Sequence, residues 1–308
     1  MKKNFFPAKV LLFGEYAVLS GGKALAFPFP RYGGYLYIPK KETQNSNRSN
    51  KSLKEFVKHL KTNAVGQLLN LNFEIIDDEL KRGLCFHSSI AEKFGIGSSG
   101  GLIASFYDRF IKPRPLDFND WTGSRINKLR TDLSLLENVF HETSSGIDPL
   151  VSYIQLPIVH QLQSSKILES TSNNDVCIFL LKTHQAAKTK VGVHQFKGLI
   201  DENTFKNEFI FTSDRCIDLI LKGDKIELFE HLKKLSVTTM DWFRYLIPEN
   251  LIPVWKEGID SDDYYLKLCG SGGGGFILGF TENWSRINDL KANYPIEVVS
   301  LICSGFRG

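Results

Sequence analysis

The sequence predicts an α+β fold with two domains. Segments with strand-like and helix-like hydrophobic patterns alternate irregularly and without a fixed repeat, which favours this class over a doubly wound parallel sheet. The 308 residues suit one large or two moderate domains, and a hydrophobic content of 42% is enough for a sizeable core. The second half is expected to begin at about residue 165.

The first half is expected to contain strands, helices and one polar loop. Residues 8–19 are apolar, and the glycines at 21 and 22 and the Pro-Phe-Pro at 28–30 punctuate the chain as strand ends and turns do. The polar stretch 39–52 has no periodic hydrophobic residues and is expected to be an exposed loop. Strands are predicted over 32–38, 72–76 and 83–88, and helices over 53–70, 98–110 and about 124–140.

The second half repeats the mixture. The apolar run VCIFLLKT, residues 176–183, predicts a strand, and helical spacing follows at 214–222 and 224–236. The segment YYLKLCGSGGGGFILGF, residues 264–280, predicts two strands joined by glycines.

Charge and cysteine content restrict the class of protein. Thirty-eight basic and 34 acidic residues leave a net charge of +4, which is too small and too scattered to indicate a nucleic-acid or membrane partner. No export signal is recognisable, and no stretch approaches the roughly 20 apolar residues that a membrane span needs. Five widely spaced cysteines without a C-x-x-C pair argue against a disulfide framework or a zinc site, so we expect a cytoplasmic protein.

The segment FGIGSSGGLIASF, residues 94–106, places glycines and serines directly before a predicted helix. Free backbone N–H groups and the helix dipole favour a phosphate there, and a serine hydroxyl can bind Mg²⁺. A turn that only caps the helix is the alternative. No lysine follows Gly97 as in a P-loop, and the pattern of a dinucleotide-binding strand and helix is also missing.

The segment HETSSGIDPL, residues 141–150, presents Asp148 in a serine-glycine turn after a predicted helix. Phosphoryl transfer needs a carboxylate that orients or deprotonates the attacking hydroxyl, and a second acid that holds the metal. Glu137 on the preceding helix is the candidate for that second acid. The alternatives are that Asp148 only stops a helix and that Glu137 is a solvated surface residue.

Two further segments suggest a ligand. Four consecutive glycines in KLCGSGGGGFILGF, residues 267–280, indicate that the backbone passes close to a ligand or another strand, or else form a flexible loop. Lys9 lies in an apolar run, where an uncompensated ammonium is costly, so it is expected to face a carboxylate or phosphate. A lysine at a strand edge that reaches solvent is the other interpretation.

These four stretches together resemble the GHMP kinase superfamily of galactokinase, homoserine kinase, mevalonate kinase and phosphomevalonate kinase, over nearly the whole chain. AKVLLFGEYAVLSGG is similar to the start of mevalonate kinases, GIGSSGG to the phosphate loop of the superfamily, and CGSGGGGF to its third motif. HETSSGID is the most discriminating segment, because it resembles mevalonate kinases and differs from galactokinases around the aspartate.

The resemblance implies roles for individual residues. Asp148 would be the catalytic aspartate, Lys9 the lysine paired with it, and Ser99 and Glu137 the Mg²⁺ ligands. The residues implied to surround the ATP phosphates are Gly95, Gly97, Ser98, Ser99, Gly100, Gly272 and Gly273. A weaker similarity in THQAAKTKVGV, residues 183–193, involves Thr183, Thr189 and Lys190, and the residues implied near the acceptor are Glu15, Ser145, Thr189 and Gly272.

The resemblance also implies the architecture and the reaction. Residues 1–165 would form a domain like ribosomal protein S5 domain 2, and residues 166–308 a ferredoxin-like domain, with ATP and acceptor meeting between them. The implied reaction is ATP-dependent phosphorylation of a small alcohol, with mevalonate converted to 5-phosphomevalonate in isoprenoid biosynthesis. A homodimer could form through exposed helices, although no pattern requires it.

Some positions depart from the family pattern. Ala91, Glu92 and Lys93 stand where a proline and a glycine usually precede the phosphate loop, Ala8 replaces a glycine, and Tyr16 replaces a histidine. Another acceptor, such as phosphomevalonate, a sugar or homoserine, therefore stays open. So does a non-catalytic protein that binds ATP or a metabolite.

Overall fold

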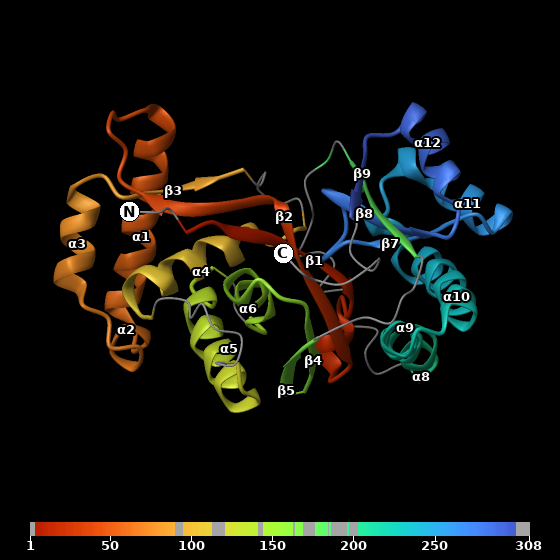
Figure 1. Cartoon of the computed structure of the whole chain (residues 1–308), viewed down its shortest axis with the longest axis horizontal. Helices are drawn as coiled ribbons and strands as arrows, with labels where there is room; N and C mark the ends of the chain where they lie inside the picture. Colours follow the sequence, from red (N-terminus) through yellow and green to blue (C-terminus); the bar gives the residue numbers. More distant parts are fainter. Residues whose placement is uncertain are drawn as a thin grey trace.

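A computed structural model gives the arrangement of the chain. It describes residues 4–89, 95–112, 121–140, 144–162, 164–168, 176–183, 185, 196 and 203–299. Helices and two antiparallel sheets share these ranges, in agreement with the predicted α+β class (Figure 1).

The first sheet is built around one long strand, β2 (Lys23–Tyr37). It pairs along its length with β1 (Phe6–Phe13), at its end with β3 (Cys85–Ser88), and at its start with β4 (Ile158–Gln161). β5 (Ser164–Ile167) completes the sheet beyond β4, and all pairs are antiparallel. The predicted division between residues 165 and 166 would fall inside β5, so we propose that any domain boundary lies after this strand.

The continuity of β2 corrects two expectations. Pro-Phe-Pro at 28–30 does not end a strand, and 32–38 is not a separate one, because both belong to β2. The pairing with β1 shifts here, since Pro7 lies opposite Gly33 whereas the next residue, Ala8, lies opposite Phe29. Such an irregularity bends the strand and lets it accept prolines that would interrupt a regular ladder.

Three helices on one side of this sheet position the candidate site, and Figure 1 shows them below β1 and β2. The predicted helix over 98–110 is confirmed as α4 (Ser98–Phe110), and the one over about 124–140 as α5 (Gly123–Glu137). α6 (Ile147–Ile154) packs with α4 against β1. Both α4 and α6 begin after a glycine with positive φ, Gly97 and Gly146.

The far end of the first sheet carries α1 (Gln44–Thr62), α2 (Val65–Leu68) and α3 (Phe73–Lys81). The loop expected over 39–52 is wrong beyond Thr43, because Thr43 and Ser46 form a capping box that starts α1 at residue 44. The strand expected over 72–76 is also wrong, since Asn72 accepts hydrogen bonds from the first turn of α3. The single helix expected over 53–70 is interrupted after Thr62.

The second sheet has the strand order β7-β8-β6-β9. Helices separate β6 from β7 and β8 from β9, which gives the β-α-β-β-α-β pattern of ferredoxin-like folds. The predicted strand over 176–183 is confirmed as β6, and the glycine run lies between β7 and β8 as expected. The elements are β6 (Cys177–Lys182), α8 (Asn203–Phe205), α9 (Phe211–Lys222), α10 (Lys225–Phe243), α11 (Ile252–Ser261), β7 (Tyr265–Leu268), β8 (Phe276–Thr281), α12 (Trp284–Asn293) and β9 (Ile296–Val299).

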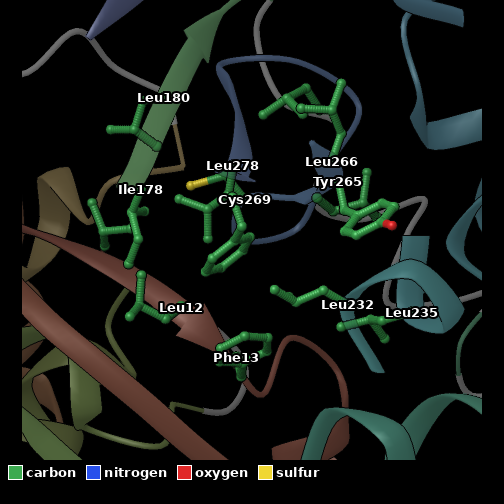
Figure 2. Close-up of a cluster of buried hydrophobic side chains, with 14 of the residues drawn as sticks. Leu12, Phe13, Ile178, Leu180, Leu232, Leu235, Tyr265, Leu266, Cys269 and Leu278 are labelled. Atoms are coloured by element: carbon green, nitrogen blue, oxygen red, sulfur yellow. The ribbon is translucent and has the colours of Figure 1, made fainter. Parts of the chain in front are cut away.

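Strand β1 joins the two halves of the molecule. Its residues Leu12 and Phe13 belong to the same buried cluster as Ile178 and Leu278 of the second sheet, and Figure 2 shows these side chains converging. The Phe13 ring stacks on Phe280 with centroids 5.4 Å apart. Burial of this apolar surface stabilises the arrangement of the two sheets, so that residues of β1 have a defined position relative to the glycine run.

Candidate active site

An ion pair between a buried lysine and a partly exposed aspartate forms the centre of the candidate site. The Lys9 ammonium of β1 lies 2.9 Å from the Asp148 carboxylate of α6, and the Lys9 side chain is only 4% exposed whereas that of Asp148 is 33% exposed. Burial by itself would lower the pKa of Lys9, but the Asp148 carboxylate raises it above the ordinary lysine value. The prediction that Lys9 faces a carboxylate is confirmed, and one third of the Asp148 side chain stays exposed.

The turn before α6 fixes the position of Asp148. Gly146 has φ +73°, and a Cβ on this residue would lie 2.4 Å from the Arg130 carbonyl oxygen, so only glycine fits. The Arg130 guanidinium donates a hydrogen bond to the Ser145 carbonyl at 2.8 Å, and Ser145 Oγ accepts from the Ile147 N–H at 3.4 Å. Ser145, expected near the acceptor, therefore lies in the turn that presents Asp148.

The glycine-serine loop closes around this ion pair. A Cβ at Gly97 would lie 3.0 Å from Lys9 Cε and 3.4 Å from Asp148 Oδ2, and one at Gly100 would lie 2.9 Å from the Asp148 carbonyl carbon. The Lys9 N–H also donates to the Ile96 carbonyl at 3.0 Å. The N-terminus of α4, with the orphan N–H groups of its first turn, thus opens beside Lys9 and Asp148. This is the electrostatic environment that favours a phosphate.

Glu137 and Ser99 lie together at the same place. Ser99 Oγ donates to Glu137 Oε1 at 3.0 Å, and the Ser144 hydroxyl donates to the other oxygen of the same carboxylate. Glu137 is buried rather than solvated. Burial and the nearby Asp148 carboxylate raise the pKa of Glu137 to about 7, although the two serine hydroxyls and Lys9 oppose this. A bound cation would favour the ionised carboxylate, so the Ser99–Glu137 pair fits a Mg²⁺ ion held mainly by phosphates.

A second buried ion pair joins the segment that follows β1 to the second sheet. Lys267 Nζ of β7 lies 2.6 Å from Glu15 Oε1, and both side chains are at most 6% exposed. Lys267 also donates to the Leu268 carbonyl and lies over the Phe13 ring. Burial raises the pKa of Glu15, and the Lys267 ammonium opposes that shift. Glu15, expected to contact the acceptor, is therefore engaged with Lys267.

The glycine run lies against the first glycine loop. A Cβ at Gly95 would be 2.8 Å from the Cys269 carbonyl oxygen, so the two loops touch through their backbones. The Tyr16 hydroxyl donates to the Ser271 carbonyl at 2.5 Å, and the Gly273 N–H donates to the Leu246 carbonyl at 2.8 Å. Gly272 has φ +67°, which favours glycine. The glycine run thus contacts other parts of the protein on both sides, and the Gly273 N–H already donates a hydrogen bond within the protein.

Tyr16, one of the departures from the pattern of the sequence resemblance, lies in a cluster of aromatic side chains. Its ring stacks between Phe196 and Phe243, with centroids 5.2 and 5.4 Å away. The side chain is buried, with 5% of its surface exposed. Packing in this aromatic cluster therefore fixes the Tyr16 ring, and the Tyr16 hydroxyl in turn binds the glycine run at the Ser271 carbonyl.

Two negative findings apply to the part of the chain that the structure describes. No three His, Cys, Asp or Glu side chains gather into a metal-binding group there. No helix in those ranges is both long and apolar enough to cross a membrane.

Comparison with known proteins identifies the fold. No protein-family model matches the sequence, and no curated protein sequence is similar to it. Solved structures do match: mevalonate kinase of L. major with R-mevalonate superposes with a TM-score of 0.63 and 18% identity, covering 99% of this chain and 97% of the other. Streptococcus pneumoniae phosphomevalonate kinase with phosphomevalonate and AMPPNP superposes with a TM-score of 0.65 and 16% identity, covering 97% of this chain and 100% of the other. Lactococcus lactis galactokinase with galactose superposes with a TM-score of 0.58 and 12% identity, covering 96% of this chain and 91% of the other.

The chain has the GHMP kinase fold. The match runs over nearly the whole length of each protein, as the sequence resemblance predicted. Because the sequence identities are this low, the comparisons establish the fold alone. Roles for individual residues must be argued from the geometry of this chain.

Within the GHMP kinase fold, the predicted residues fall into three groups. Lys9, Asp148, Ser99 and Glu137 converge with the loop that holds Gly95, Gly97, Ser98 and Gly100. Glu15, Ser145 and Gly273 are bonded to protein groups, and Thr183 Oγ1 donates to the Gln185 carbonyl at 3.0 Å. Thr189, Lys190, Lys93 and the departures at Ala91 and Glu92 lie outside the described residues.

Two residues of the site were not anticipated. Lys267 lies in an apolar run, as Lys9 does, so the argument that a buried ammonium needs a partner would have found it. Ser144 gave no comparable signal, because its contact with Glu137, seven positions earlier, forms only in the folded chain.

Proposed function

We propose that this protein is an ATP-dependent kinase that phosphorylates the hydroxyl group of a small alcohol, and that mevalonate is its acceptor. The observation that carries this proposal is the pair of buried Lys9 and partly exposed Asp148 beside the N-terminus of α4, with Ser99 and Glu137 next to it. A carboxylate, a cation, a phosphate-binding helix end and a metal-binding pair are the groups that phosphoryl transfer uses.

Asp148 would accept the proton of the acceptor hydroxyl. The hydroxyl oxygen attacks the γ-phosphorus of ATP, the bond from this phosphorus to the β,γ-bridging oxygen breaks, and ADP leaves. Lys9 holds the orientation of the Asp148 carboxylate through the 2.9 Å contact. One oxygen of the carboxylate thereby stays available to the acceptor, since the side chain is one-third exposed.

The first turn of α4 would hold the phosphates. Gly97 and Gly100 allow this backbone to lie against Lys9 and Asp148. The Ser98 and Ser99 N–H groups would therefore lie close to an acceptor hydroxyl bound at Asp148. Ser99 and Glu137 would bind Mg²⁺, which neutralises charge on the β- and γ-phosphates during transfer. Ser144 orients the Glu137 carboxylate from the opposite side.

Glu15 and Lys267 would act by positioning rather than by contact with the acceptor. Their buried pair fixes the end of β7, directly before the glycine run, relative to the end of β1. Ser145, Gly272 and Thr189 remain proposed contacts of the acceptor, with Gly272 and Gly273 near the nucleotide. The cytoplasmic setting and the place in isoprenoid biosynthesis are proposals of the same standing.

The acceptor is supported by the HETSSGID segment and by the L. major mevalonate kinase structure with R-mevalonate. The match to phosphomevalonate kinase is equally good by superposition, so the assay must separate the two. We would incubate purified protein with Mg·ATP and, separately, mevalonate, phosphomevalonate, galactose or homoserine, and identify products by ³¹P NMR. A phosphomonoester formed from mevalonate supports the proposal. A product from another acceptor alone, or nucleotide binding without any product, contradicts it.

A further inference from the structure

One face of α5 holds the turn that leads into α6. Arg130 and Ser134 are four residues apart, so their side chains leave the helix on the same side. Arg130 Nη1 donates to the Ser145 carbonyl at 2.8 Å, and Ser134 Oγ donates to the Ser144 carbonyl at 2.8 Å. Two consecutive carbonyls of the turn are therefore bound by two successive turns of α5.

Both of these carbonyls precede the hydrogen-bond ladder of α6. The Gly146 carbonyl accepts from the Leu150 N–H at 3.1 Å, whereas Ser144 and Ser145 lie before the N-cap of this helix. A carbonyl outside a helix takes its donor from elsewhere in the protein or from water, and here α5 supplies the donors. The approach of the chain to α6 is therefore set by side chains of another helix.

The turn also lies in direct contact with α5. A Cβ on Gly146 would be 2.4 Å from the Arg130 carbonyl oxygen, 3.0 Å from Ser134 Cβ and 3.2 Å from Arg130 Cγ. The turn therefore has little room to move toward α5, while the two hydrogen bonds oppose movement away from it. The separation between α5 and the turn is restrained in both directions.

This contact determines the position of Asp148. Asp148 is the second residue after Gly146 and lies in the first turn of α6, so a shift of the preceding turn moves it. Its backbone also lies against α4, because a Cβ on Gly100 would be 2.9 Å from the Asp148 carbonyl carbon. α5 packs against both α4 and α6 (Figure 1). Since the Asp148 carboxylate lies 2.9 Å from Lys9 Nζ, even a small shift changes the geometry of that ion pair.

Other residues of α5 fix the helix itself. Near its start, Asn127 Oδ1 accepts from the Ser165 N–H of β5 at 2.8 Å, and Ser165 Oγ lies 2.8 Å from His160 Nδ1 in β4. At its end, Glu137 accepts from Ser99 Oγ of α4 at 3.0 Å. The helix therefore links the edge of the first sheet, the turn before α6 and the first turn of α4.

We propose that Arg130 and Ser134 are positioning residues that hold Asp148 in the geometry needed for phosphoryl transfer. Both act through backbone carbonyls of the turn, and neither contacts ATP or the acceptor in this proposal. The role rests on the proposed function, in which Asp148 accepts the hydroxyl proton. A purely structural role would instead lower stability and leave the turnover of the folded protein unchanged.

The kinetic test removes one donor at a time. Ser134→Ala and Arg130→Met are each expected to lower kcat about tenfold or more, because small misplacement of a reacting group is costly. The affinity for Mg·ATP, measured by calorimetry at saturating Mg²⁺, should stay near the wild-type value. Arg130→Lys keeps a donor for the single carbonyl of Ser145 and is expected to recover most of the loss in kcat, whereas Met fills similar space without a donor.

Two matched controls make the same chemical changes elsewhere in the first half of the chain. Ser105→Ala removes a buried hydroxyl that donates to the Leu102 carbonyl within α4 at 2.9 Å. Arg109→Met removes a guanidinium that is paired with Glu79. Both controls are expected to keep kcat near the wild-type value. Circular dichroism and urea titration establish that each variant is folded.

A crystal structure of Ser134→Ala beside that of the wild type supplies a measurement that does not depend on activity. The Asp148 carboxylate is expected to be displaced relative to Lys9 Nζ. An undisplaced Asp148, an unchanged kcat in folded Ser134→Ala, or an equal loss in Ser105→Ala overturns the proposal. So do equal values of kcat in Arg130→Met and Arg130→Lys, and if Arg130→Met does not fold, Ser134→Ala decides. A wild type without turnover counts against the proposed function instead, and the two structures still show whether Ser134 places Asp148.

Discussion

Replacement of Gly97 by alanine would disturb the ion pair at the centre of the site while removing no functional group. Gly97 has φ +74°, a conformation that costs a residue with a Cβ about 1–2 kcal/mol. The new methyl group would also lie 3.0 Å from two carbons of Lys9 and 3.4 Å from Asp148 Oδ2, so Lys9 or the loop must move by a few tenths of an ångström. Lys9 is buried and cannot swing into solvent. We therefore expect the 2.9 Å contact between Lys9 and Asp148 to change.

The matched control for this change is Gly83→Ala. Gly83 has φ +87°, and a Cβ there meets nothing closer than Pro39 Cδ at 4.0 Å. Both variants should lose about 1–2 kcal/mol of unfolding free energy in urea titrations, because both place a Cβ in the left-handed region. Turnover should fall about 100-fold in Gly97→Ala, since small misplacement of reacting groups is costly, and stay near wild type in Gly83→Ala. Similar turnover in the two folded variants would refute the argument that Gly97 sets the geometry of Lys9 and Asp148.

Three further predictions concern other charged or titrating groups. Lys267→Met should lower the unfolding free energy, measured in urea, by about 3–5 kcal/mol, because Glu15 is left buried without its partner. Adding Glu15→Gln should restore part of this loss, and additive losses in the double variant would contradict the pairing. Burial lowers the pKa of His160 to about 4, so His160 is protonated below about pH 6.5 in the unfolded chain but only below about pH 4 in the folded protein. The unfolding free energy should therefore fall by up to about 3 kcal/mol as the pH is lowered through this window. If His160→Gln has the same pH profile of urea unfolding as the wild type, this reasoning is wrong. Glu137→Gln should raise the Mg²⁺ concentration for half-maximal turnover about tenfold or more in a magnesium titration, and an unchanged requirement would remove Glu137 from the proposed metal site.

Local signals in the sequence predicted part of the fold well. The helix over 98–110 coincides with α4, because its apolar spacing and the glycine before it specify both the helix and its start. The polar stretch 39–52 has no apolar periodicity, yet residues 44–52 belong to α1, so the missing periodicity does not exclude a helix. The Thr43–Ser46 capping box, which starts α1, was the overlooked local signal.

The candidate site was predictable where a buried charge demanded a partner. Lys9 in an apolar strand had to meet an anion, and the partner is Asp148. The sequence could not show that Glu15 pairs with Lys267, because 252 positions separate the two residues and only the packing of β1 on the second sheet joins them.

The most direct test of the central claim compares wild type with Asp148→Asn in a coupled assay of ADP release with Mg·ATP and mevalonate. Asparagine keeps the size of the side chain but cannot accept the hydroxyl proton as a carboxylate does. We predict mevalonate-dependent ADP release by the wild type, a loss of several orders of magnitude in turnover in Asp148→Asn, and nearly unchanged ATP affinity by calorimetry. Turnover by the variant at the wild-type rate, or an equal loss of turnover and ATP affinity, would contradict the role assigned to Asp148.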